Sequence, residues 1–202
     1  MSMRKPEDSY HHGHLAESFL DAVDEIATQF GIEAVTLRAC AKRVGVSPSS
    51  AFRHYADKRA LLTAFATRAI NQLADAMEGA KHQAHLSDTD AFHAVGLAYV
   101  TFALDKPAFF RAMWREETIY SQDADYVAAA NRLAGYLKEG FVRTIEDEDP
   151  TAFSPLELLA WSSVHGLAGL FVDGPIARDR TREEKIGIAD AMLKGLAPAF
   201  DT

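Results

Sequence analysis

Apolar residues recur at steps of three and four along most of this chain, the spacing that gathers them on one face of an amphipathic helix. The first such stripe is formed by Leu15, Phe19, Val23, Ile26, Ala27 and Phe30. Gly31 follows it and can end the helix in a left-handed conformation. Two short helices are predicted next, over 37–44 and from Ser47-Pro48 to about Tyr55, and then a long one from about Lys58 to about Lys81.

The remaining two thirds of the chain also show helical spacing. Ser87 opens a helix that must stop before Pro107, because proline disfavours helical geometry in the preceding residue. Further helices are predicted over 108–116, 122–146, 155–172 and 182–196. Ser154 and Thr181 each precede a glutamate by three residues, which is capping-box spacing. No segment alternates with period two, so the sequence predicts an all-α fold of about nine helices.

The segment from Thr36 to Leu62 predicts a helix-turn-helix. Two short helices are joined by Gly45-Val46-Ser47, where glycine permits the tight turn. Thr36 is placed to cap the first helix, and we also expect it among the DNA-binding residues. The second helix would enter a DNA major groove, with the residues of its first turn at the base edges: Ser47, Pro48, Ser49 and Ser50. Arg38 on the first helix can reach a guanine edge.

Charge is distributed unevenly. The whole chain has 21 basic and 29 acidic residues, a net charge of −8, which alone would argue against a nucleic-acid partner. Residues 36–59, however, hold six basic residues against Asp57 alone, a net of +5. Residues 63–202 hold 13 basic and 21 acidic residues. A basic island on an acidic body fits DNA binding through the island only.

These motifs resemble the DNA-binding domain of the tetracycline-repressor-like (TetR) family. The resemblance rests on Gly45-Val46-Ser47-x-x-x-x-Phe52-x-x-Tyr55-x-x-Lys58-x-x-Leu61, preceded by Thr36-Leu37-Arg38-x-x-Ala41-x-x-Val44. It implies that the Arg38 position and the first turn of the second helix read bases. It also implies that Arg53, His54, Tyr55 and Lys58 belong to the DNA-binding surface, the last three holding phosphates. Phe52 departs from the tyrosine usual in the family and has no hydroxyl for a phosphate.

The rest of the chain resembles a subgroup of the family with a Trp/His/Gly-containing C-terminal domain, through Lys106 to Trp114 and Trp161-x-x-x-His165-Gly166. The resemblance implies domains at 1–60 and 61–202, a homodimer formed through the last helices, and a small-molecule pocket. Ser162, Gly166 and Gly169 form a small-residue stripe where we expect the dimer interface. The pocket residues we expect are Tyr99, Phe102, Phe109, Met113, Trp114, Tyr126, Trp161 and His165.

Several of these residues have a plainer interpretation. The aromatic residues and Met113 can equally form an ordinary core, and His165 can be a hydrogen-bonded core histidine. Cys40 is the single cysteine and occupies an apolar helical position, which favours a buried structural thiol. His11, His12 and His14 lack a second ligand cluster, so capping or phosphate contact explains them better than a metal. Arg4 and Lys5 form either a DNA-binding arm or a solvated tail.

The sequence also bears on two other classes of function. The sequence lacks G-x-S-x-G, a P-loop and H-E-x-x-H, so no enzyme is predicted. A helical ligand-binding or scaffolding protein without DNA binding is the stronger alternative. With no leader-like apolar region and no long apolar run, a cytoplasmic protein without membrane spans or cofactors is expected. The sequence thus predicts a homodimeric repressor that binds a palindromic operator and is released by a small molecule.

Overall fold

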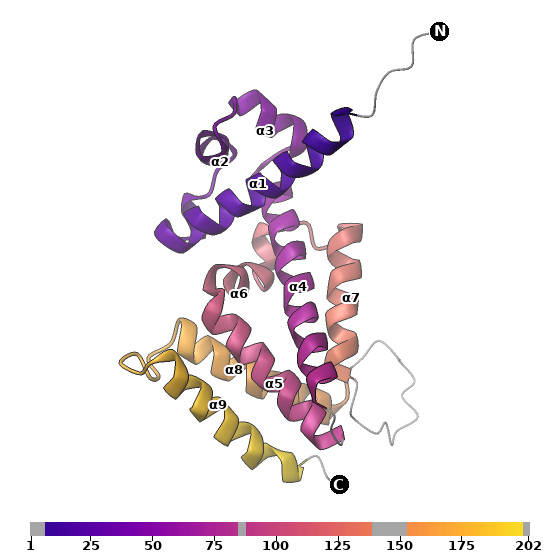
Figure 1. Cartoon of the computed structure of the whole chain (residues 1–202), viewed down its shortest axis with the longest axis vertical. Coiled ribbons are helices and arrows are strands. Elements are labelled where there is room, and N and C mark those ends of the chain that lie inside the picture. Colours follow the sequence, from indigo (N-terminus) through magenta and orange to yellow (C-terminus); the bar gives the residue numbers. More distant parts are fainter. Residues whose placement is uncertain (1–6, 85–87, 139–152, 200–202) are drawn as a thin grey trace. The chain divides into compact units, whose positions relative to one another are not determined.

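A computed structural model describes residues 7–84, 88–138 and 153–199 of the chain. Within these ranges it contains α-helices and short 3-10 turns and no strand, so the all-α prediction is confirmed (Figure 1). The helices are α1 (Glu7–Phe30), α2 (Leu37–Val44), α3 (Pro48–His54), α4 (Lys58–Gln83), α5 (Asp88–Asp105), α6 (Pro107–Met113), α7 (Ala124–Lys138), α8 (Pro155–Val172) and α9 (Arg182–Leu196). The 3-10 turns are η1 (Ile32–Ala34), η2 (Glu116–Thr118) and η3 (Ala197–Ala199).

The predicted capping boxes are present at the starts of α8 and α9. The Glu157 amide donates to Ser154 Oγ at 3.2 Å, and the Ser154 amide donates to Glu157 Oε2 at 2.7 Å. Thr181 and Glu184 form the same reciprocal pair at 3.2 and 2.8 Å. Each box satisfies two backbone amides at a helix start, which explains why both boundaries could be read from the sequence.

Other boundaries differ from the predicted ones. α1 begins at Glu7 instead of Leu15, and the helix expected over 108–116 ends at Met113. After Met113 the chain turns into η2, where Arg115 pairs with Glu117 at 2.9 Å and with Glu33 of η1 at 2.8 Å. The helix has thus ended before these ion pairs form. Ser87 and the far end of the helix expected over 122–146 lie outside the described residues.

The chain divides into two compact units that do not follow chain order. One consists of Met1–Ala69 with Ala108–Val127, and the other of Ile70–Pro107 with Ala128–Thr202. α4 therefore contributes to both. The sequence suggested a boundary near residue 60, with everything after it in one domain, whereas 108–127 belongs to the unit that holds the N-terminal helices.

The first unit is built on buried residues of α1, α2 and α4. Phe19 and Cys40 are fully buried. Phe65 of α4 stacks on Phe109 of α6 with ring centroids 4.5 Å apart, which joins the returning segment to this core. Apolar burial of this kind is the main stabilising contribution.

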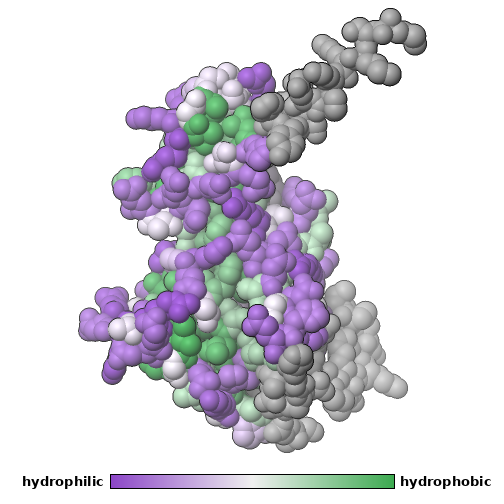
Figure 2. Space-filling model, viewed as in Figure 1, coloured by the Kyte–Doolittle hydropathy of each residue, from purple (hydrophilic) through white to green (hydrophobic). Residues whose placement is uncertain are grey.

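The second unit is held together by α5, which packs against α8 and α9 (Figure 1). Gly96 of α5 permits this close approach, since a Cβ there would lie 2.8 Å from Leu193 Cδ2 of α9. Tyr99 is buried beside α8, and its hydroxyl lies 3.0 Å from His165 Nδ1. On the face shown in Figure 2, hydrophilic residues predominate and apolar residues emerge in separate patches.

Candidate functional site

The turn between α2 and α3 has the geometry expected of a helix-turn-helix. Thr36 Oγ1 accepts a hydrogen bond from the Ala39 amide at 3.0 Å and so caps α2. Gly45 is left-handed, with φ 80° and ψ 27°, a conformation that glycine adopts without a Cβ clash. The Val46 amide then donates to the Ala41 carbonyl at 3.0 Å. The turn thus ends α2 sharply and allows α3 to begin at Pro48.

The first turn of α3 is organised by side-chain hydroxyls. Within the described part of the chain, the Ser47 side chain makes no bond to a backbone amide of α3. Ser47 Oγ instead lies 2.8 Å from Ser49 Oγ and 3.1 Å from Ser50 Oγ. Arg53 Nη2 donates to Ser50 Oγ at 3.2 Å. Because hydroxyls both donate and accept, this cluster can meet either kind of group on a base edge.

Most of the residues expected at the DNA surface are accessible. Those exposed are Thr36, Arg38, Ser47, Pro48, Ser49 and Arg53, and those half-buried are Ser50, His54 and Lys58. Lys58 Nζ donates to the Glu33 carbonyl at 3.1 Å, which uses one of the three ammonium donors. The side chain is therefore fixed near the start of α4, with further donors for a phosphate.

Tyr55 departs from the expectation. Its side chain is 9% exposed and packs edge-on against Phe19, with ring centroids 6.0 Å apart. Its hydroxyl donates inward to the Ala16 carbonyl at 3.4 Å, and burial raises the pKa of Tyr55 to about 12. The structure therefore places Tyr55 in the core between α1 and α3 and not at a surface where it could hold a phosphate.

The six basic side chains of residues 36–59, the basic island, do not all face solvent in the same way. Arg43 is turned toward α1, where Nη1 lies 3.1 Å from Glu25 Oε2 and Nη2 lies 3.4 Å from Gln29 Oε1. Arg59 Nε donates to the Ile119 carbonyl at 2.7 Å. Arg38, Lys42 and Arg53 are exposed as well, and Arg43 is the basic residue of this window whose charge is compensated by a glutamate of α1.

A polar network that the sequence did not reveal surrounds the start of α4. Asp57 Oδ1 accepts from the Ala60 amide at 2.8 Å, and Asp57 Oδ2 accepts from the Tyr120 hydroxyl at 2.6 Å. The bond from Tyr120, followed by that from Ala60, holds the pKa of Asp57 below its usual value. Arg59 lies 4.6 Å above the Tyr120 ring. Asp57 and Tyr120 are 63 residues apart, so no local pattern could have paired them.

Thr63 gives a direct test of this network. Its Oγ1 accepts from the Tyr120 amide at 2.9 Å and donates to the Arg59 carbonyl at 2.8 Å. Thr63→Val keeps the shape and removes the acceptor, so the free energy of unfolding should fall by about 1–2 kcal/mol in chemical denaturation. In the control Thr67→Val, the lost hydroxyl donates to the Thr63 carbonyl of its own helix, and the change should stay within about 0.5 kcal/mol. Equal losses in the two variants would contradict the network's role.

The residues expected to line an effector pocket fall into two groups. Phe109, Met113, Trp114 and Tyr126 belong to the first unit, and Tyr99, Phe102, Trp161 and His165 belong to the second. Tyr126 donates to the Met113 carbonyl at 3.3 Å, as a core tyrosine does. His165 is paired with Tyr99, and burial lowers the pKa of the His165 imidazole.

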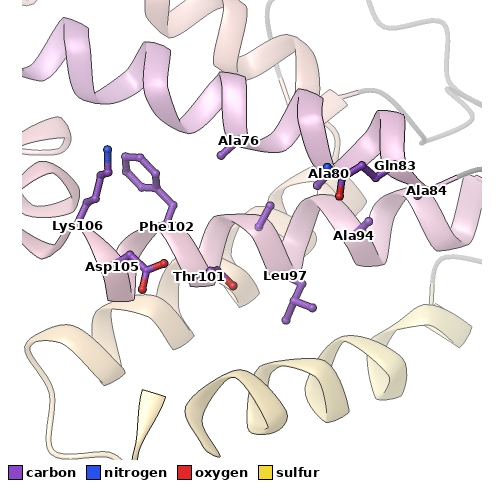
Figure 3. A pocket seen from close by; sticks show the side chains of 11 residues that line it. Ala76, Ala80, Gln83, Ala84, Ala94, Leu97, Thr101, Phe102, Asp105 and Lys106 are labelled. Carbon is purple, nitrogen blue, oxygen red and sulfur yellow. The ribbon is translucent and has the colours of Figure 1, made fainter. Parts of the chain in front are cut away.

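A cavity of about 540 Å³ lies in the second unit, between α4 and α5 (Figure 3). Of the eight expected residues, Phe102 lines it. The other lining residues are Ala76, Ala80, Gln83, Ala84, Ala94, Leu97, Ala98, Thr101, Asp105 and Lys106. The sequence pattern did not reveal this site, because a pocket was expected among aromatic residues, whereas the space lies where alanines line the two helices.

The expected dimer stripe lies on the outer side of α8. Ser162 and Gly166 are exposed and Gly169 is half-buried, while Ala160, Val164 and Ala168 are buried. Leu159 and Leu170 are also exposed on this helix. Among the described residues, α8 is the one helix long and apolar enough to cross a membrane by length and composition, a test that core helices also pass.

Cys40 and the N-terminal histidines are the remaining residues with metal-binding or nucleophilic chemistry. Cys40 is fully buried, and burial raises the pKa of its thiol to about 11, so it is a neutral structural group. In the ranges that the structure describes, no three His, Cys, Asp or Glu side chains converge as metal ligands would. The side chains of His11 and His12, and Arg4 and Lys5 of the expected arm, lie outside the described residues.

The fold and this site define a helix-turn-helix protein with a helical C-terminal part. Residues 19–65 match the family model described as bacterial regulatory proteins, tetR family. Residues 92–194 match the model described as the tetracyclin repressor-like C-terminal domain, which covers half of the chain. The chain belongs to the tetracycline-repressor-like family of bacterial regulatory proteins.

Individual proteins and solved structures are also similar to this chain, the structures in their fold. An uncharacterized HTH-type transcriptional regulator, YobS, of Bacillus subtilis (strain 168) is 31% identical over 100 residues, which is 50% of this chain and 51% of that protein. The chain thus matches about half the length of this curated relative. A protein of unknown function from Rhodococcus sp. RHA1 superposes with a TM-score of 0.73 at 26% identity, covering 96% of this chain and all of that one. A TetR family regulator from Marinobacter aquaeolei VT8 superposes at 0.63 with 21% identity, covering 92% and 96%.

Proposed function

We propose that this protein is a homodimeric transcriptional repressor that binds a palindromic DNA operator and is released from it by a small molecule. The observation that carries the proposal is the accessible start of α3, where Ser47, Ser49 and Arg53 are exposed after a turn fixed by Gly45. The N-terminal residues of such a helix are those that meet base edges in a major groove. No catalytic role is assigned to the chain.

The DNA contacts divide into two kinds. Arg38 and the side chains of the first turn of α3 read base edges, and an arginine paired with guanine discriminates by about 1–3 kcal/mol. Lys58 and His54 contact phosphates, which positions the protein without selecting a sequence. Tyr55 contributes only by fixing the angle of α3 against α1, because it is buried between them.

The dimer is proposed to form through the outer faces of α8 and α9. Small residues let another helix approach closely, and the exposed leucines of α8 supply apolar area around them. Ile188 extends the apolar surface to α9. A two-fold arrangement buries the same patch on both protomers and presents two α3 helices to two half-sites.

Release is proposed to follow binding of the effector in the cavity between α4 and α5. α4 begins at Lys58 beside the DNA surface and ends among the cavity residues, so one helix belongs to both sites. An effector that binds more tightly to the conformation with the lower DNA affinity shifts the protein toward that conformation. The loss of DNA affinity cannot exceed the ratio of the effector's affinities for the two conformations.

Selection of binding sites from random DNA tests the proposal. We expect enrichment of an inverted repeat whose half-site centres are about 34–36 Å apart, or a multiple of that distance. Enrichment of a single half-site would contradict the dimeric arrangement. A pool with no enrichment would favour a ligand-binding or scaffolding protein without sequence-specific DNA binding.

A further inference from the structure

Two acidic residues adjoin Lys58, and a later segment of the chain binds the carboxylates of both. We infer that Arg115 and Tyr120 of that segment are positioning residues for the phosphate contact of Lys58. Each binds one carboxylate, that of Glu33 or that of Asp57, and so keeps it from the Lys58 ammonium group. This inference rests on the DNA binding proposed above, and it adds residues that act on DNA through Lys58.

Asp57 directly precedes Lys58, and both of its carboxylate oxygens are bonded to other groups. Oδ1 accepts from the Ala60 amide at 2.8 Å, which caps the start of α4. A carboxylate in a helix cap keeps a second oxygen for another donor, and here the Tyr120 hydroxyl binds it at 2.6 Å. The second oxygen of Asp57 is thus held by a residue from far along the chain and not by the neighbouring ammonium group.

Glu33 contacts both Lys58 and Arg115, through different groups. Its backbone carbonyl accepts from Lys58 Nζ at 3.1 Å, whereas its side-chain Oε1 lies 2.8 Å from Arg115 Nη1. Arg115 Nε also donates to Glu117 Oε1 at 2.9 Å, so this guanidinium joins two carboxylates. In the part of the chain that the structure describes, Lys58 forms no ion pair with Glu33 or Asp57.

The segment that carries Tyr120 is fixed on α4 independently of Asp57. Arg59 Nε donates to the Ile119 carbonyl at 2.7 Å, and the Tyr120 amide donates to Thr63 Oγ1 at 2.9 Å. The Arg59 guanidinium also lies 4.6 Å above the Tyr120 ring. Because these contacts do not involve the hydroxyl, its loss should leave the segment in place and release only the Asp57 carboxylate.

A released carboxylate acts against a phosphate contact in two ways. It can pair with the Lys58 ammonium group, which must then give up that pair before it binds phosphate. It also repels the phosphate directly. Since a phosphate contact carries no sequence information, the resulting loss of affinity should be the same for every DNA sequence.

Tyr120→Phe tests this effect, because it keeps the ring and removes the hydroxyl. Fluorescence anisotropy of the full-length protein would be measured with two labelled duplexes, the selected operator and one of unrelated sequence. We expect both affinities to fall by about two- to tenfold, the net effect of one hydrogen bond. The matched control is Tyr136→Phe, which should leave DNA affinity unchanged. Tyr136 also has an arginine against its ring, with Arg132 5.8 Å from the ring centre, and it belongs to the second unit.

Asp57→Asn shows whether the carboxylate is the cause of the loss. Asparagine retains an oxygen for the cap of α4 and lacks the charge. In the Tyr120→Phe background this change should restore the lost DNA affinity, a larger gain than it gives in the unmodified protein. In a Lys58→Ala background, Tyr120→Phe should change affinity by no more than about twofold, because the contact that it supports is already absent. A residue that only stabilised the fold would weaken binding equally in every background.

Arg115 and Glu33 allow the same test of the second carboxylate. Arg115→Met should weaken binding to both duplexes. Glu33→Gln should restore affinity in that background, because the backbone carbonyl that accepts from Lys58 is unchanged. Chemical denaturation of each variant in parallel ensures that only folded proteins are compared.

Several outcomes would overturn the inference. One is an equal loss from Tyr120→Phe with and without Lys58, and another is an equal loss from Tyr120→Phe and Tyr136→Phe. A third is failure of Asp57→Asn to restore affinity. In each of these cases the unmodified protein still binds the operator, so the proposed function stands. If the unmodified protein binds neither duplex, the proposed function fails and this inference fails with it.

Discussion

Replacing Gly166 by arginine is expected to separate the dimer and to lower operator affinity by about 10²–10⁴-fold, because two linked DNA-binding heads engage an operator far more tightly than one. Gly166 lies on the exposed side of α8 in the middle of the proposed dimer interface. An arginine there would place a charged side chain between two helices that must approach closely. Sedimentation should show a monomer at micromolar concentration.

The structure predicts that the same change does not harm the isolated protomer. A Cβ built on Gly166 meets no described atom within 4 Å. Glycine is also about 1 kcal/mol less favourable in a helix than most residues, so the protomer should gain stability. Gly135 on α7 is an equally open, exposed helical glycine away from the proposed interface, which makes Gly135→Arg the matched control.

The two glycine variants together separate dimerisation from folding. Gly135→Arg should remain dimeric and bind the operator normally. If Gly166→Arg also remains a dimer with full operator affinity, the interface lies elsewhere on the protein. If both variants lose the dimer, the effect is not specific to α8.

Replacing Arg38 by alanine is expected to relax base preference at one position of each half-site. Its guanidinium is exposed on α2, and a bidentate contact to guanine gives about 1–3 kcal/mol of discrimination, a factor of about 5 to 150. The affinity for the selected operator should fall by that factor, whereas the affinity for operators changed at the contacted base should fall little. Binding titrations over a set of single-base operator variants would measure this.

Lys58→Ala is the comparison for Arg38→Ala. Because a phosphate contact carries no sequence information, this variant should weaken binding to all sequences and reduce the salt slope by about one unit per phosphate contact. Part of its loss will reflect the bond from Nζ to the Glu33 carbonyl, so its thermal stability is measured in parallel. If both variants weaken binding to every sequence equally, the assignment of base reading to Arg38 is wrong.

Local signals in the sequence predicted most of the helices well. α2, α8 and α9 begin and end where the sequence analysis placed them, since their caps lie within a few residues of each boundary. The end expected near residue 116 was wrong: the helix ends at Met113, and Arg115 then pairs with Glu33, which is distant along the chain. Long-range ion pairs leave no periodic trace in the sequence.

The two candidate sites were predictable to different degrees. The DNA surface is formed by a contiguous segment, so its motif could be read directly, although the inward position of Tyr55 depends on Phe19 and Ala16 of α1. The candidate effector site, the cavity, is formed by two helices. Its walls depend on which alanines of α4 face those of α5, and the aromatic residues expected there fall in both units.

The sequence by itself determined the all-α class, the helix-turn-helix and the family resemblance, because caps, turns and apolar stripes act over a few residues. The tertiary structure decided which basic side chains remain exposed, how 108–127 joins the N-terminal unit and where the cavity lies. Each of these depends on contacts between residues far apart in the chain, such as Tyr120 with Asp57 and Arg182 with Asp105. Such contacts are fixed only when the helices pack.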